Sequence, residues 1–136
     1  MAYAALTILD ALQAALAAVD GVDRVLRGRA DFVRPQAGVT VFLMPTALAH
    51  GNAGVRRLTV ELAIAGVNQS AAADETVLGL VAEIEAVLDS EAEAAMGASI
   101  TFGEWFIPAL VRQGAAALVG AVIELTLDFV GPLKTA

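Results

Sequence analysis

The sequence predicts an α+β fold: a mainly antiparallel sheet of four or five strands with two helices packed on one face, in the order α-β-β-(β)-α-β-β. Two stretches repeat apolar residues at the helical period, and two others alternate between apolar and polar residues as half-buried strands do. Short connections favour antiparallel pairing, and two amphipathic helices cover one face of such a sheet. The length of 136 residues suits one core, so we expect residues 1–136 to form a single domain.

The first half of the chain predicts one helix and two or three strands. Residues 4–18 place leucines on one helical face, and the helix ends at an Asp-Gly pair. Residues 22–26 are a short candidate strand. Residues 39–44 form a strand rich in β-branched side chains, and residues 57–65 alternate cleanly.

The segment between these last two strands predicts a flexible loop or hairpin tip. Pro45 is expected to end the preceding strand, and residues 46–55 are rich in Gly, Ala and Asn. We expect the loop from Pro45 to Arg57 to become ordered when the protein assembles with partners.

The second half predicts a helix followed by two strands. Residues 71–88 carry an apolar stripe at helical spacing. Residues 99–107 predict a strand stopped by Pro108. Residues 118–129 predict the last long strand, with its apolar residues inward and its acidic residues outward, and residues 131–132 are expected to end the ordered chain.

Composition argues against a membrane protein. The chain is 58% apolar with a mean hydropathy of +0.73, but alanine supplies much of this value. The longest uncharged apolar run, residues 114–123, is about half of the roughly 20 residues that a spanning helix needs. The N-terminus has no basic region and reaches Asp10 early, so we expect no signal peptide and a protein made on the cytoplasmic side.

The charge argues against a nucleic-acid-binding protein, and the cysteine count excludes further kinds of site. The net charge is −7 and the isoelectric point is near 4.5, which is the wrong sign for holding nucleic acid through its phosphates. There is no cysteine, and therefore no disulfide, thiolate nucleophile or cysteine-based zinc site.

We expect no catalytic residue, cofactor or metal site. Hydrolase, phosphate-loop, dinucleotide and zinc-protease signatures are absent. His50, the only histidine, lies in the predicted loop beside no nucleophile. Glu83 and Glu85 point to different sides of a helix, and Glu124 and Asp128 lie about 13 Å apart along a strand. A carboxylate pair assembled from separate elements stays an open alternative.

Basic and aromatic residues are the candidates for a subunit or partner interface. The arginines suit bidentate pairing with carboxylates of a neighbouring subunit, and a solvated rim or contact with nucleic acid are the alternatives. The aromatic and methionine side chains are adjacent to, or alternate with, core positions, so we expect one of each pair to face a partner. The candidates are Arg24, Arg27, Arg29, Arg34, Phe42, Met44, Arg56, Arg57, Trp105 and Phe106.

Three carboxylates are predicted on the outward side of the last two long strands. Glu61, Glu124 and Asp128 give the sheet an acidic face. If that face lines a channel, it repels phosphate and lets DNA slide through. Plain exposure to solvent is the alternative.

The whole pattern resembles tail terminator (tail completion) proteins of long-tailed bacteriophages. The resemblance rests on the size, the order of elements and three segments: the opening helix ALTILDALQAAL, the GVDRV that follows it, and the closing strand VIELTLDF. It covers nearly the whole chain. Gene transfer agents and tail-like bacteriocins use similar proteins.

The resemblance implies a structural virion protein of the tail or neck, assembled in the host cytoplasm. Such a subunit forms a homo-oligomer, typically a hexameric ring, that caps the tail tube, stops its growth and joins the head through connector proteins. DNA passes through without sequence-specific binding. The close alternative is a head-completion or connector protein of the same neck. An enzyme or small-molecule-binding domain, from a different class, needs a pocket of convergent polar groups.

Overall fold

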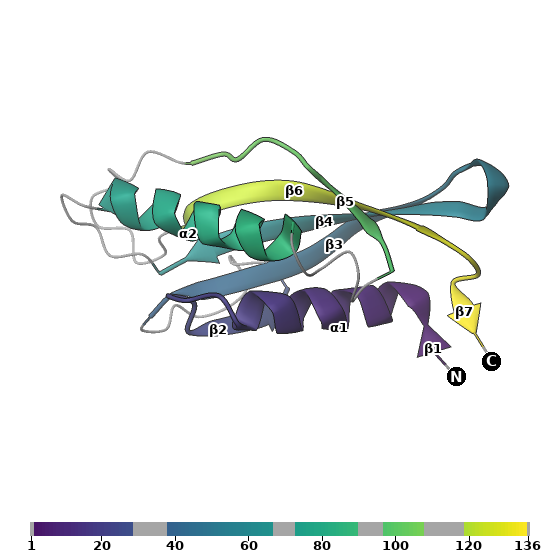
Figure 1. Ribbon diagram of the computed structural model, residues 1–136, viewed down its shortest axis with the longest axis horizontal. Helices are drawn as coiled ribbons and strands as arrows, with labels where there is room; N and C mark the ends of the chain where they lie inside the picture. Colours follow the sequence, from purple (N-terminus) through teal and green to yellow (C-terminus); the bar gives the residue numbers. More distant parts are fainter. Residues whose placement is uncertain (1, 29–37, 67–72, 90–96, 108–118, 136) are drawn as a thin grey trace.

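The computed structural model describes residues 2–28, 38–66, 73–89, 97–107 and 119–135 (Figure 1). Its elements are β1 (Ala2–Tyr3), α1 (Ala4–Ala17), β2 (Arg24–Arg27), β3 (Thr40–His50), a 3-10 turn η2 (Asn52–Gly54), β4 (Val55–Ala65), α2 (Ala73–Val87), β5 (Ser99–Phe102), β6 (Val119–Val130) and β7 (Lys134–Thr135). Within these residues, two α-helices and a five-stranded sheet form the predicted α+β fold.

The sheet is mixed, with the strand order β2-β3-β4-β6-β5. The pairs β3–β4, β4–β6 and β6–β5 are antiparallel, which confirms the prediction of a mainly antiparallel sheet. β2 runs parallel to β3. The connection between them, residues 28–39, has the length that a parallel pair needs.

The core lies between the helices and one face of the sheet. The alternation predicted for β4 and β6 places Leu62 opposite Ile123, and both side chains are buried. Figure 1 shows α1 and α2 side by side over the same face. Their buried residues repeat at helical spacing, because each helix packs through one stripe. These residues are Ile8, Leu9, Leu12 and Leu16 of α1, and Val77, Leu80, Val81, Ile84 and Leu88 in and just after α2.

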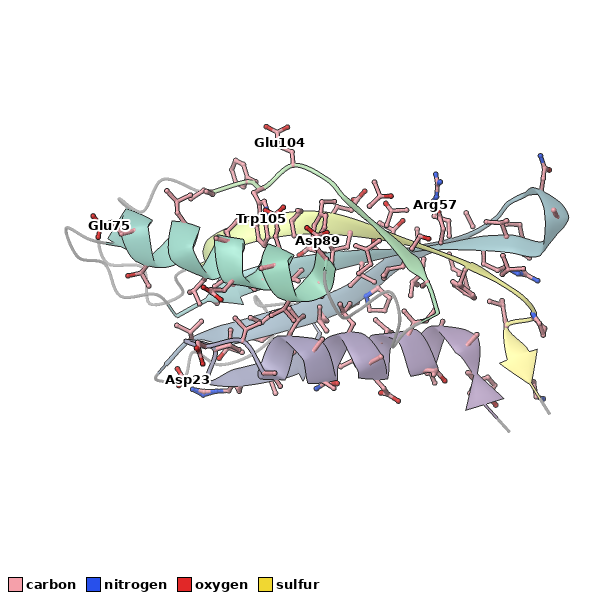
Figure 2. All side chains as sticks on the ribbon, in the orientation of Figure 1. Asp23, Arg57, Glu75, Asp89, Glu104 and Trp105 are labelled. Atoms are coloured by element: carbon pink, nitrogen blue, oxygen red, sulfur yellow. The ribbon has the colours of Figure 1, made fainter. Side chains whose placement is uncertain are left out.

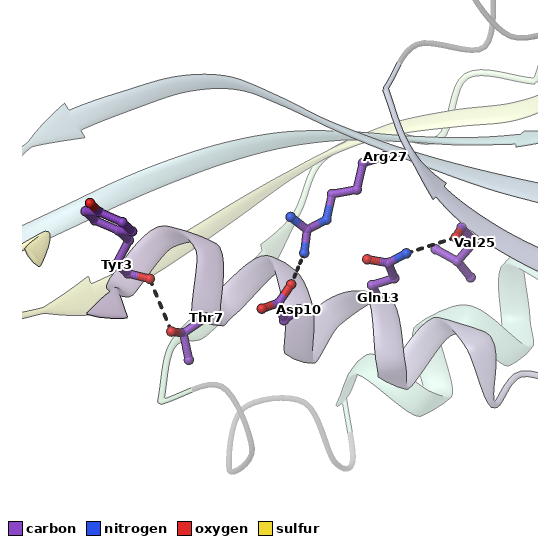
Figure 3. Close-up of polar contacts among 6 residues, drawn as sticks. All are labelled: Tyr3, Thr7, Asp10, Gln13, Val25 and Arg27. Carbon is purple, nitrogen blue, oxygen red and sulfur yellow. Dashed lines mark hydrogen bonds and ion pairs between the residues drawn. The ribbon is translucent and has the colours of Figure 1, made fainter. Parts of the chain in front are cut away.

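Two side-chain hydrogen bonds of α1 are drawn in Figure 3. At its start, the Thr7 hydroxyl donates a hydrogen bond to the carbonyl oxygen of Tyr3 at 3.1 Å. Nearer its end, Gln13 Nε2 donates to the carbonyl oxygen of Val25 at 3.0 Å. Because Val25 belongs to the edge strand β2, this second bond links the helix to that strand. It also gives the half-buried amide of Gln13 a partner, which avoids the cost of an unsatisfied polar group.

The prediction that Pro45 ends its strand is wrong. β3 continues through Pro45, which pairs with Val60, and the register shifts between Pro45 and Ala47. The pairing of β2 with β3 stops at Leu43, so β3 is an edge strand from that point within the described residues. Proline has no N–H to donate, and it is therefore tolerated on an edge strand or at a bulge.

Of the two predicted alternatives for this segment, the hairpin tip is confirmed, because it forms the end of a long β3–β4 hairpin. We call residues 46–57 the arm. In Figure 1 the arm projects beyond both helices. Residues 46–54 are all exposed, and β6 accompanies the arm on one side as far as the pairing of Val55 with Val130. The turn itself occupies Asn52–Gly54, where Ala53 adopts a left-handed backbone conformation with φ 58°.

Two predicted strand ends also differ from the structure. β5 stops at Phe102, and Phe106 forms an isolated bridge to Val122. Between these two pairings, the segment from Phe102 to Phe106 has one residue more than the facing segment of β6. The chain does not lose its order at residues 131–132, because β7 pairs with β1 beside the N-terminus. That pairing depends on where the two ends of the chain meet, which local patterns do not reveal.

Candidate functional site

The sheet face opposite the helices, here called the outer face, begins with an apolar row. Register aligns Phe42, Ala63 and Val122 across three strands, and the bridge adds Phe106. Phe106 and Val122 exchange backbone hydrogen bonds of 2.7 and 2.8 Å. Phe42 and Ala63 are buried, whereas Phe106 is 66% exposed at the edge of the row. The outer face thus presents an aromatic ring that is open to a partner.

The next row places two carboxylates opposite each other. Glu61 pairs in register with Glu124, and Met44 completes the row on β3. Like charges on directly opposite positions destabilise a sheet. Among the described residues, no lysine or arginine forms an ion pair with either glutamate. The middle of the outer face is therefore acidic, at a cost to stability.

The third predicted acid does not add to this charge. Arg57 donates two hydrogen bonds to Asp128, from Nε to Oδ1 at 2.9 Å and from Nη2 to Oδ2 at 3.1 Å. The two residues lie directly opposite each other on β4 and β6. The register of β4 and β6 thus gives Arg57 a carboxylate of its own chain and balances the charge of Asp128.

The hydrogen bonds of this pair shift both ionisation equilibria. The hydrogen bond from Arg57 holds the pKa of the Asp128 carboxyl below its ordinary value, with burial opposing and the charge of Arg57 assisting. In turn, the hydrogen bond to Asp128 raises the pKa of Arg57. Both side chains keep substantial contact with solvent, so the pair is screened and its contribution to stability is small.

We expect the stabilising effect of Asp128 to depend on pH. Its pKa in the folded protein lies below the unfolded value of about 3.9, so its contribution is present above about pH 4 and disappears as the pH falls through the folded pKa. Asp128→Asn should therefore lower the free energy of unfolding at pH 7 and have no such effect in strong acid. Urea titrations of both proteins across this range measure the difference. A difference that grows as the pH falls would contradict the assigned pair.

The other predicted arginines are divided between the two faces and the undescribed segments. Arg27 points toward the helices and forms an ion pair with Asp10 of α1 (Figure 3), so this arginine also uses a carboxylate of its own chain. Arg24 is half-buried and aligns with Thr40 on the outer face. Arg29 and Arg34 lie outside the described residues.

The prediction that one of Trp105 and Phe106 packs inward agrees with their positions. Trp105 packs against the core, and its Nε1 donates a hydrogen bond to Glu85 Oε2 of α2 at 3.2 Å. Figure 2 shows Trp105 beside α2. A half-buried indole whose N–H has a partner is typical of packing at the edge of a core. Phe106 is the member that stays available to a partner.

The end of the arm is basic. Arg56 Nη1 lies 3.1 Å from Nε2 of His50 and also contacts Nδ1. The two residues pair across the hairpin, and both lie on the helix side of the sheet. Among the described residues, Arg56 has no carboxylate partner. His50 is exposed, as the sequence predicts, but it ends a strand instead of lying in a loop.

The sequence patterns missed one exposed apolar residue of α2. Leu78 is 54% exposed, although the predicted stripe of this helix leaves it out. Glu75 and Ala82 lie beside it at helical spacing and Gly79 follows it in sequence, and all three are exposed, as is Glu83 further round the helix. A leucine that lies outside the predicted apolar stripe is the sequence signal that marks this patch. Its small neighbours allow a partner to approach closely.

Two further kinds of feature are absent from the described residues. In the described part of the chain, no group of three or more His, Cys, Asp or Glu side chains is arranged to hold a metal ion. No helix there is long and apolar enough to cross a membrane. No protein-family model matches the sequence, and no protein with a curated description is detectably similar to it.

Proposed function

We propose that this chain is a structural subunit of a phage-type tail, a tail terminator that assembles into a ring, ends growth of the tail tube and offers the surface that joins the head. The resemblance described above suggests this function. The α+β fold with both helices on one face is the architecture that the resemblance implies. The proposal therefore rests on the sequence pattern, with the arm as the structural observation that supports it most.

The arm suits a protein that functions by contacting other subunits. Its residues 46–54 are exposed, and it buries no side chain of the core. On its free side, β3 from Met44 to His50 has no strand partner among the described residues. A long exposed edge of this kind is a liability in a lone subunit, because it invites pairing. In an assembly, a neighbouring subunit covers such an edge.

The outer face provides the chemistry for a DNA channel. Glu61 and Glu124 form an acidic pair at its middle, and three threonines, Thr59, Thr101 and Thr126, form the next row. An acidic, hydroxyl-lined wall repels phosphate without binding bases. A ring that turns this face to its lumen lets DNA pass, and the like-charge pair is then retained for passage despite its cost.

We expect the purified protein to form rings. Native mass spectrometry over a concentration series should show a closed oligomer, and electron micrographs should show particles with a central hole. The exposed arm supplies contacts for this assembly. If the protein is monomeric at every concentration and also when mixed with tail tubes, the proposal is wrong.

A further inference from the structure

We propose that the basic end of the arm of one copy docks on the solvent side of α2 of a second copy. This inference rests on the proposed function in that it supplies the contact between neighbouring copies in the ring. It assigns the partner of the arm as a second copy of this chain. Two surfaces with complementary charge and exposed leucines carry the argument.

The first surface is the helix-side end of the arm. Leu48 is 44% exposed and shares this side with His50 and Arg56, because the three occupy alternating or paired positions of the hairpin. The guanidinium of Arg56 is next to His50 and has no carboxylate partner within the described residues. The arm thus presents an apolar centre with a cation beside it.

The second surface is the solvent side of α2. Leu78 is 54% exposed and has Gly79 and Ala82 beside it. Because these neighbours have small side chains or none, the leucine side chain stands above the helix surface around it. Glu75, three residues before Leu78, is exposed on the same side of the helix, and Glu83 is exposed further round it. α2 contains no lysine or arginine, and its field is therefore uniformly acidic. Its apolar centre and acidic rim complement the apolar centre and basic rim of the arm.

The two surfaces lie too far apart to meet within one chain. In Figure 1, α2 lies toward one end of the long axis and the arm forms the other end. Figure 2 shows Glu75 of α2 near one end and Arg57, where the arm begins, in the opposite half of the molecule. Complementary surfaces at opposite ends of one molecule join copies head to tail. Head-to-tail contacts close into a ring when the rotation between neighbours allows it.

Site-specific cross-linking tests the contact, because the chain has no cysteine of its own. Leu48→Cys protein is mixed with Leu78→Cys protein under mild oxidation. We expect the mixed disulfide to form roughly 100-fold faster than the disulfide between Leu48→Cys and Leu6→Cys proteins, since docking raises the local thiol concentration. Leu6 is the matched control, being 49% exposed on α1. All three positions are exposed, and circular dichroism checks that the variants fold.

Charge reversal provides a second readout. Arg56→Glu and Glu83→Arg should each weaken self-association roughly five- to tenfold, and the double variant should restore it, because every contact then carries the exchanged pair. Equal rates of cross-linking of Leu78→Cys and Leu6→Cys proteins to Leu48→Cys protein overturn the inference.

The outcomes separate this inference from the proposed function. If rings form but the Leu48–Leu78 cross-link does not, the result agrees with the proposed tail function and contradicts the proposed contact. A cross-link in a protein that does not stop tube growth supports the contact and removes the function.

Discussion

Replacing Leu62 by alanine should lower the free energy of unfolding by about 3 kcal/mol. Leu62 is fully buried in central strand β4, between Leu43 and Ile123 on its neighbours. The substitution removes most of a side chain from the layer where the sheet meets the helices. The surrounding strands are held by their register and cannot close the cavity completely. Urea unfolding followed by circular dichroism measures the loss.

Leu6→Ala is the control for this core prediction. Leu6 lies on α1 and is 49% exposed, so its truncation should change the free energy of unfolding by no more than about 0.5 kcal/mol. Equal losses for the two variants would contradict the assigned core.

Shortening the arm should abolish ring assembly while the fold survives. Residues 50–56 can be replaced by Asn-Gly, which joins the paired residues Ala49 and Arg57 through a two-residue turn. The removed segment contains no buried core residue, so the free energy of unfolding should change by about 1 kcal/mol or less. It contains Arg56 and His50, and the free edge of β3 becomes shorter.

The control for the shortened arm keeps its length. Ala53→Gly relieves the left-handed conformation of residue 53 without moving the arm, and this variant should assemble as the unchanged protein does. Sedimentation velocity of the variants gives the result directly. Rings formed by the shortened protein would show that the arm is not an assembly element.

The residues of the core could be predicted from the sequence, because the spacing of apolar residues along a helix or strand indicates directly which side is buried. The alternation of residues 57–65 and 118–129 predicts the inward sides of β4 and β6, and their apolar positions such as Leu62 and Leu125 are buried. The helical stripe predicts the buried side of α1 in the same way, as Leu12 shows.

The candidate surfaces could be predicted less well from the sequence than the core, because they depend on pairings between segments that are distant in the chain. Pro45 stops a central strand but not an edge strand, and only the short length of β2 makes β3 an edge there. Arg57 and Asp128 are 71 residues apart, so their ion pair requires the register of β4 and β6. Leu78 was detectable in principle, as a leucine that the stripe of α2 does not use.

The measurement that tests the central proposal most directly is the length of tail tubes assembled with and without this chain. Tail tube protein alone should polymerise to open-ended lengths. With this chain present, tubes should stop shorter, with a ring at one end in electron micrographs, and the shortened-arm variant should have no effect. Identical length distributions and bare tube ends in the presence of the unchanged protein would contradict the proposal.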